Sequence, residues 1–303
     1  MAQGRFLIVA LLLVLAGCRA LPDGAQCWSL DGRPLSSPAP DATVQAEQLQ
    51  AVAQARALWL ATPEDRNAVI WYARRLGYVG RYREAIAVLS DALDRDPGDP
   101  FLLRHRGYRW ITLREFGKAA ADLERAAAAC RTTPDEVEPD GQPTPGRPPH
   151  SSLHFNVHYH FGLALFLARD FELAERAWLD CLAVVDDDES RVAVTHWLWS
   201  VRMRLGDEAG AAAVVAPIHE RMDVVENVSY LNLCLLYGGK RRRAEIAPRA
   251  GSSGSALGFG LAHFELARGN REAARAAFED LAKSPGWSAF GSIAAEAELA
   301  HWR

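Results

Sequence analysis

Histidines at the start of one predicted helix are the side chains of this sequence whose spacing best suits metal chemistry. His154 and His158 are four residues apart, so on a helix they share one face and could hold a metal ion between them. His160 lies about 200° from His158 around that helix, because each residue turns it by about 100°. A third ligand would have to come from elsewhere, such as His196, and no HExxH pattern is present. We therefore expect surface and packing histidines, with a metal-dependent envelope enzyme or metal carrier as the alternative.

The motifs that usually mark catalysis or nucleotide binding are missing. The glycines between Gly251 and Gly260 match neither GxGxxG after a strand nor GxxxxGK, and we find no GxSxG elbow. The basic run Lys240–Arg243 is expected to be a solvated turn, the alternative being contact with anionic lipid head groups. A net charge of −4 argues against a general nucleic-acid binder, which needs a basic face. We expect a non-enzymatic protein without cofactor, metal or small-molecule substrate.

An internal sequence repeat predicts the architecture. Residues 66–99 fall on residues 100–131 after a shift of 34, small residues meeting small ones and bulky residues bulky ones. The matched pairs are Ala73 with Gly107, Leu76 with Trp110, Tyr82 with Phe116, Ala85 with Ala119, Leu89 with Leu123 and Ala92 with Ala126. This period, with small residues where two helices approach closely, is the signature of the tetratricopeptide repeat (TPR), a helix–turn–helix unit.

Further units extend the repeat in both directions. Half a repeat precedes residue 66, and a third clear unit follows at an offset of 55, which leaves 21 additional residues at 132–152. Weaker units continue to a terminal helix at 287–302. We predict an all-α, right-handed α-solenoid of about five to six TPR-like units. Residues 43–131 would hold the half-repeat and two units, and residues 153–303 the remaining units with a capping helix.

Several local sequences resemble a group of bacterial TPR proteins to which no chemistry is assigned. They are Arg104-His105-Arg106-Gly107, the acidic stretch before Gly141, His196-Trp197-Leu198, and the segment from Ala289 to Leu299. The resemblance supports the fold and implies no activity. More broadly, the chain resembles repeat lipoproteins that act as envelope-assembly adaptors and pilotins.

The N-terminus reads as an export signal rather than as part of the fold. Arg5 precedes a ten-residue apolar run, Phe6–Leu15, which is too short to span a bilayer. Leu15-Ala16-Gly17-Cys18 resembles a bacterial lipobox, which implies a signal peptide at 1–17, a lipid on Cys18 and a location in the cell envelope. Arg19 favours the periplasmic face of the outer membrane in a Gram-negative cell. Proline, serine and glycine make residues 18–42 a predicted flexible tether.

The remaining cysteines do not form a recognisable site. Cys27, Cys130, Cys181 and Cys234 contain no CxxC pair, and the last three lie on or near apolar helix faces. Export would permit a disulfide. We expect buried free thiols that act as small hydrophobic residues.

The insert, residues 132–152, is rich in proline and acid. Six prolines exclude a helix, and Asp135, Glu136, Glu138 and Asp140 lie within six residues. One hypothesis places the insert along the concave face near Arg74 and Arg104, where it completes or occludes a groove. The other leaves it as a disordered loop in solvent.

The concave face of the superhelix is the expected binding surface, and the resemblance implies which residues line it. They are Asn67, Arg74, Tyr78, Arg104, Tyr108, Asn156 and Tyr159. Aromatic rings with arginines suit an extended peptide, because Arg grips carboxylates bidentately. The carboxylate clamp of chaperone-adaptor repeats is not matched, since it wants Lys and Asn where Ile70 and Arg74 stand. We predict a membrane-anchored adaptor that binds a protein or peptide, the alternative being that these residues only pack or face water.

Overall fold

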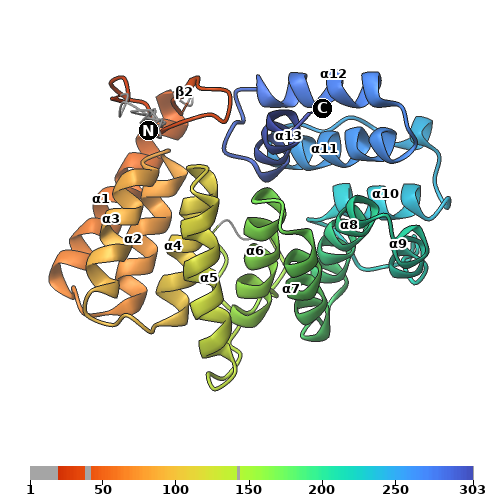
Figure 1. The fold of residues 1–303 in the computed structure, drawn as a ribbon. Coiled ribbons are helices and arrows are strands. Elements are labelled where there is room, and N and C mark those ends of the chain that lie inside the picture. Colours follow the sequence, from red (N-terminus) through yellow and green to blue (C-terminus); the bar gives the residue numbers. More distant parts are fainter. Residues whose placement is uncertain (1–19, 38–41, 142–143, 303) are drawn as a thin grey trace, which may run out of the picture.

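The fold is a stack of antiparallel helix pairs (Figure 1). This computed structural model describes residues 20–37, 42–141 and 144–302. Within these ranges the helices are α1 Ala42–Ala61, α2 Arg66–Tyr78, α3 Tyr82–Leu93, α4 Pro100–Thr112, α5 Phe116–Cys130, α6 Leu153–Leu167, α7 Phe171–Ala183, α8 Asp188–Leu205, α9 Glu208–Val215, α10 Val228–Tyr237, α11 Gly251–Ala267, α12 Arg271–Ala282 and α13 Phe290–Ala300. Two short strands, β1 Cys27–Trp28 and β2 Pro34–Leu35, and a 3-10 turn at Arg243–Glu245 complete the described elements.

Each repeat is a helix pair, and capping residues in the sequence set where its helices begin. Asp99 accepts a hydrogen bond from the Leu102 amide and Pro100 occupies the first turn, so α4 begins there. Ala85 and Ala119 are fully buried, and a Cβ on Gly107 would lie 2.7 Å from Leu123 Cγ. Only small residues therefore allow the paired helices to approach. The predicted all-α solenoid and its 34-residue register are confirmed.

The predicted tether is wrong for residues 20–37, which pack as a hairpin on the repeats. β1 and β2 pair antiparallel with Cys27 opposite Leu35, and Gly32 takes φ +82° in the connecting turn. Cys27 and Leu35 are buried in one cluster with Tyr82 and Trp287. The apolar partners come from distant parts of the chain, so local composition alone suggested a linker. Residues 1–19, with the signal peptide and Cys18, lie outside the described residues.

The hairpin at residues 20–37 and the helices α11–α13 lie side by side above the repeats (Figure 1). Arg33 Nη2 donates to the Ala282 carbonyl at 3.0 Å, and Trp287 Nε1 donates to the Ser36 carbonyl at 2.9 Å. One apolar core continues from Ile111 through Leu163 to Ile293. The stack is therefore closed by its own C-terminal helices rather than ending freely.

Two arginines in unusual backbone conformations hold α13 in place. Arg114 and Arg169 have φ of 64° and 68° at the turns within their repeats, where Gly80 takes 74° in the first repeat. A side chain in this region costs roughly 1–2 kcal/mol, so a compensating contact is expected. Arg114 Nε donates to Glu296 Oε2 at 3.2 Å, and Arg169 Nη1 lies 3.7 Å from Glu298 Oε2. Both arginines thus connect a repeat turn to a carboxylate of the closing helix.

Candidate peptide-binding groove

The inner groove is formed by α2, α4 and α6, and the insert lies against it. We define the groove by Arg74 and Tyr78 from α2, Arg104 and His105 from α4, and Asn156 from α6. These helices are the first members of three successive repeats. Their stacking therefore brings residues from three separate stretches of sequence to one surface.

Glu138 is the insert residue that enters the groove. Its side chain is only 6% exposed, and its Oε2 lies 3.1 Å from Arg104 Nη2. Asn156 Nδ2 donates to the same oxygen at 2.6 Å, and His105 Nε2 donates to Oε1 at 3.1 Å. A buried carboxylate is costly unless paired and hydrogen-bonded, and here three side chains from two helices satisfy it.

The charge states of this cluster are set by burial and by Arg104. Burial alone would raise the pKa of Glu138, but the Arg104 charge and the hydrogen bonds from His105 and Asn156 lower it to about 2. Burial, together with Arg104, lowers the pKa of His105 to about 3, so its imidazole is neutral. With Nε2 protonated, His105 Nδ1 accepts from Arg104 Nη1 at 3.0 Å. The ionised Glu138 carboxylate thus pairs directly with the Arg104 guanidinium, and the neutral His105 ring hydrogen-bonds to both side chains.

Backbone contacts tie the rest of the insert to the same surface. Arg74 Nη1 donates to the Pro139 carbonyl at 2.6 Å. Gly141 lies so close to Tyr78 that a Cβ there would be 1.6 Å from Tyr78 Oη. At the base of the insert, the Glu138 amide donates to the Ser151 carbonyl at 3.0 Å, within a bridge between Val137 and Ser152. The hypothesis that the insert docks near Arg74 and Arg104 is confirmed, and the solvent-loop alternative is wrong for its described residues.

The seven residues predicted to bind a peptide fall into three groups. Arg74, Tyr78, Arg104 and Asn156 lie against the insert, as described above. Tyr108 packs between the His160 and Phe290 rings, and Tyr159 is buried with its Oη accepting from Trp197 Nε1 at 2.8 Å. Asn67 is exposed. Peptide binding by these seven residues stays a prediction. Only four of them, Arg74, Tyr78, Arg104 and Asn156, lie together at the groove.

Comparison with solved structures identifies the fold. A TPR protein from Parabacteroides merdae ATCC 43184 superposes with a TM-score of 0.50 at 15% identity, covering 85% of this chain and 94% of that one. The chain has the tetratricopeptide-repeat fold. YrrB, whose structure is described as a TPR protein with an unusual peptide-binding site, gives a TM-score of 0.44 at 15% identity, over 76% of this chain and 100% of YrrB. No family model and no curated protein matches the sequence.

The histidines of this TPR chain do not converge. His160 Nδ1 donates to the Asn156 carbonyl at 2.6 Å, and His196 lies in a separate aromatic cluster 3.1 Å from Tyr237 Oη. Burial lowers the pKa of both imidazoles to about 3. His154 and His158 line a different cavity, on α6 beside α5 and α7. Across the described ranges no three His, Cys, Asp or Glu side chains are grouped to hold a metal ion.

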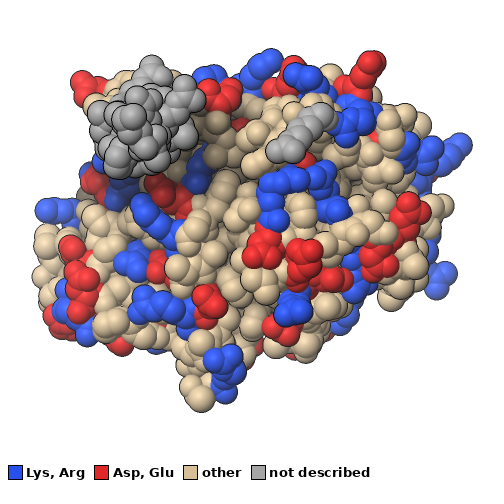
Figure 2. Space-filling model, viewed as in Figure 1, with Lys and Arg blue, Asp and Glu red and all other residues tan. Residues whose placement is uncertain are grey.

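The basic run of the TPR chain is mostly occupied by contacts within the protein. Lys240 Nζ donates to the Ala216 and Ile218 carbonyls, each at 2.6 Å. Arg241 pairs with Glu220 at 2.8 Å and Arg242 with Glu245 at 2.7 Å. Acidic and basic side chains are also interspersed over the face shown in Figure 2. These residues stabilise a turn instead of forming an uncompensated basic patch.

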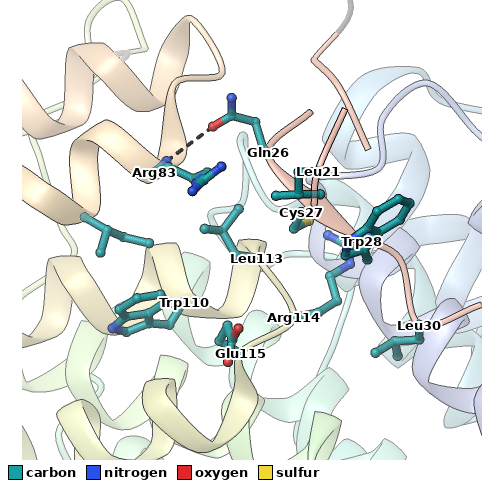
Figure 3. A pocket seen from close by; sticks show the side chains of 11 residues that line it. Leu21, Gln26, Cys27, Trp28, Leu30, Arg83, Trp110, Leu113, Arg114 and Glu115 are labelled. Atoms are coloured by element: carbon teal, nitrogen blue, oxygen red, sulfur yellow. Dashed lines mark hydrogen bonds between the residues drawn. The ribbon is translucent and has the colours of Figure 1, made fainter. Parts of the chain in front are cut away.

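A second cavity lies between the hairpin and the repeats (Figure 3). It measures about 550 Å³, and the Gln26 side chain at its edge accepts from the Arg83 amide at 3.3 Å. Trp28, Trp110 and Leu113 supply apolar walls, and Arg114 and Glu115 supply charge. The sequence could not indicate this cavity, because one wall belongs to the hairpin that was expected to be a tether.

The four described cysteines are free and buried, as expected. Burial is the main cause that raises the pKa of Cys27 and of Cys130 to about 11. Nearby Glu296 contributes at Cys27, and Asp135 and Glu138 contribute at Cys130. Each of these two thiols therefore lies beside one docked segment of the chain, which makes them useful reporters.

Proposed function

We propose that this protein is a non-enzymatic TPR adaptor that binds a protein or peptide partner in the inner groove. One observation carries the proposal: the groove holds an irregular, non-helical peptide segment around Glu138, gripped through both side chain and backbone. Side-chain anchoring combined with main-chain hydrogen bonds is a usual way to recognise an extended peptide. The groove thus has the chemistry of a peptide site, and the occupant belongs to the chain itself.

Crosslinking at the groove edge tests this proposal. A photo-crosslinking amino acid replaces Asn67, which is exposed in the first turn of α2, or Ala121, which is exposed on α5. Asn67 precedes Arg74 by seven residues, about two helical turns, and so shares its helix face. Crosslinks formed in the native envelope are identified by mass spectrometry, and binding is then measured with the purified partner. A partner captured from position 67 and absent from position 121 is expected. Equal capture from both positions, or a partner that shows no saturable binding, would contradict the proposal.

We also propose that a lipid on Cys18 holds the adaptor at the envelope, on the periplasmic face of the outer membrane in a Gram-negative cell. Support comes from the apolar run Phe6–Leu15 and the lipobox-like Leu15-Ala16-Gly17-Cys18. In the part of the chain that the structure describes, no helix has both the length and the hydropathy needed to cross a bilayer. For an adaptor placed there we propose a role in envelope assembly.

Cell fractionation tests the anchor. Cys18→Ser should move the protein from the membrane to the soluble envelope fraction, because a thioether-linked lipid cannot form on serine. Arg19→Ala, which keeps the cysteine, should stay with the membranes. Membrane retention of the Cys18→Ser protein equal to that of wild type would reject lipid anchoring.

A further inference from the structure

We infer that the inner groove selects an extended acidic peptide, and that the segment Val137–Gly141 of the insert is its intramolecular ligand. A partner would bind by placing a carboxylate where Glu138 now lies. The inference rests on the proposed adaptor function and specifies its ligand class. The groove would then be a site that is closed in the free protein and opened by competition.

The groove presents more positive charge than Glu138 compensates. Burial lowers the pKa of Arg104, Glu138 opposes this, and the charges of Arg74 and Arg109 lower the pKa further. The Arg104 guanidinium thus has two further positive charges near it and one buried carboxylate of the insert as its ion-pair partner. An anionic partner relieves this repulsion, whereas a basic or apolar segment would not. The electrostatics therefore favour an acidic ligand.

Arg104 is also incompletely satisfied by the insert. Its Nη1 and Nη2 contact His105 and Glu138, but its Nε is buried without a hydrogen-bond partner. An arginine normally binds a carboxylate through two parallel N–H groups of its fork. A ligand carboxylate that also reaches Nε would make one more charge-assisted hydrogen bond than Glu138 does. The carboxylate of an external ligand can therefore bind Arg104 more tightly than Glu138 does.

The insert is held at the groove by one buried side chain, that of Glu138, and by backbone contacts such as the Arg74 hydrogen bond to the Pro139 carbonyl. Glu138 is its one buried residue among those described, while Asp135, Glu136, Val137 and Pro139 are exposed. Val137 in particular is 58% exposed. Because no apolar side chain among these residues is buried, releasing the segment should uncover little apolar surface. Because both ends of the insert are tethered, its effective concentration at the groove is of millimolar order, which weakens apparent binding of any competitor.

A peptide titration tests the inference. The probe is a fluorescein-labelled peptide with the sequence of residues 133–141, TPDEVEPDG. Its binding to the purified protein is measured by fluorescence anisotropy in wild type, Glu138→Gln and Glu136→Gln. Glu138→Gln removes the internal anchor and should raise affinity at least about 10-fold. Glu136→Gln, a matched change at an exposed neighbour, should bind as weakly as wild type. A peptide with Gln in place of Glu at its sixth position should lose most of the gain.

A second variant opens the groove without changing any charge. Gly141→Ala places a methyl group against Tyr78 Oη, so the insert must move away while Arg104, His105 and Asn156 remain. It should raise peptide affinity as Glu138→Gln does, and circular dichroism should show native helicity in both variants. If neither folded variant binds the peptide more tightly than wild type, or if the Gln peptide binds equally well, the inference is wrong.

The outcomes separate this inference from the adaptor proposal. A partner captured at position 67 whose affinity is unchanged by Glu138→Gln and by excess peptide would leave the adaptor function standing and reject the acidic-ligand inference. Peptide binding that requires Arg104 but is found without any cellular partner at position 67 would support the groove chemistry and contradict the adaptor function. If the peptide does not bind and no partner is captured at position 67, both the acidic-ligand inference and the adaptor proposal are rejected.

Discussion

The insert and the closing helix α13 dock onto the repeats with the same chemistry and different consequences. Each delivers a buried glutamate to an arginine of the repeats: Glu138 to Arg104, and Glu296 to Arg114. Around Glu296, however, Ile293, Ala294 and Ala295 are fully buried, whereas Glu138 is the one buried residue described in the insert. A buried ion pair by itself is weak evidence for stability. The apolar surface beside it decides whether a docked segment is part of the core or a displaceable ligand.

The largest effect is expected at the closing helix. Glu296→Ala leaves Arg114, whose side chain is 3% exposed, as a buried unpaired charge. Such a change should reduce the free energy of unfolding by about 3–5 kcal/mol. Urea denaturation followed by circular dichroism measures it. Glu279→Ala, which removes an exposed partner of Arg275, is the control and should cost less than about 1 kcal/mol. A loss below that control would mean that α13 is not held by Arg114.

A smaller and local effect is expected at the insert. Glu138→Gln should reduce the free energy of unfolding by about 2 kcal/mol, which is the magnitude of hydrogen bonds to a charged group. The loss stays this small because the segment can leave the groove, so that water can hydrate Arg104. Thiol labelling under native conditions localises the change. Cys130, beside the insert, should react faster, while Cys27, beside α13, keeps its wild-type rate. Faster labelling of both thiols would indicate global rather than local opening.

The insert should also respond to acid in a defined range. The pKa of Glu138 is lowered from 4.5 to about 2 by its partners, so the docked state is favoured by the ionised carboxylate. Its contribution is complete above about pH 4.5 and is lost as the pH falls toward 2. Carboxyl 13C NMR of glutamate-labelled protein, with Glu138→Gln to assign the signal, should give a midpoint well below 4.5. A midpoint at 4.5 would show that the insert is already undocked.

The sequence predicted the repeats because their packing is local and periodic. Small residues at Ala85 and Ala119 recur every 34 positions and fix the register. For the acidic insert it supported two hypotheses, docking near Arg74 and Arg104, which opposite charge and proline stiffness favour, and a disordered loop in solvent. Among four clustered acids, nothing in the sequence singled out Glu138. Its selection depends on where Asn156, on another repeat, comes to lie.

The closure of the stack could not be predicted from local patterns. The hairpin at 20–37 has strands too short to show alternation, and its core partner Trp287 lies about 250 positions away in the chain. One signal was available and was missed. Arg114 and Arg169 occupy turn positions where another repeat has Gly80. An arginine in a position that favours glycine indicates a side chain required for a distant contact.

Native-state hydrogen exchange tests the central claim, that the insert is a displaceable ligand and α13 a structural element. Exchange is followed by mass spectrometry at increasing sub-denaturing urea, for peptides covering residues 136–141 and 290–300. The insert amides, including Glu138 N–H on the Ser151 carbonyl, should exchange through a low-energy opening that is insensitive to urea. The α13 amides should exchange only with global unfolding and show the full urea dependence. Equal opening free energies and equal urea dependence for the two segments would contradict the account.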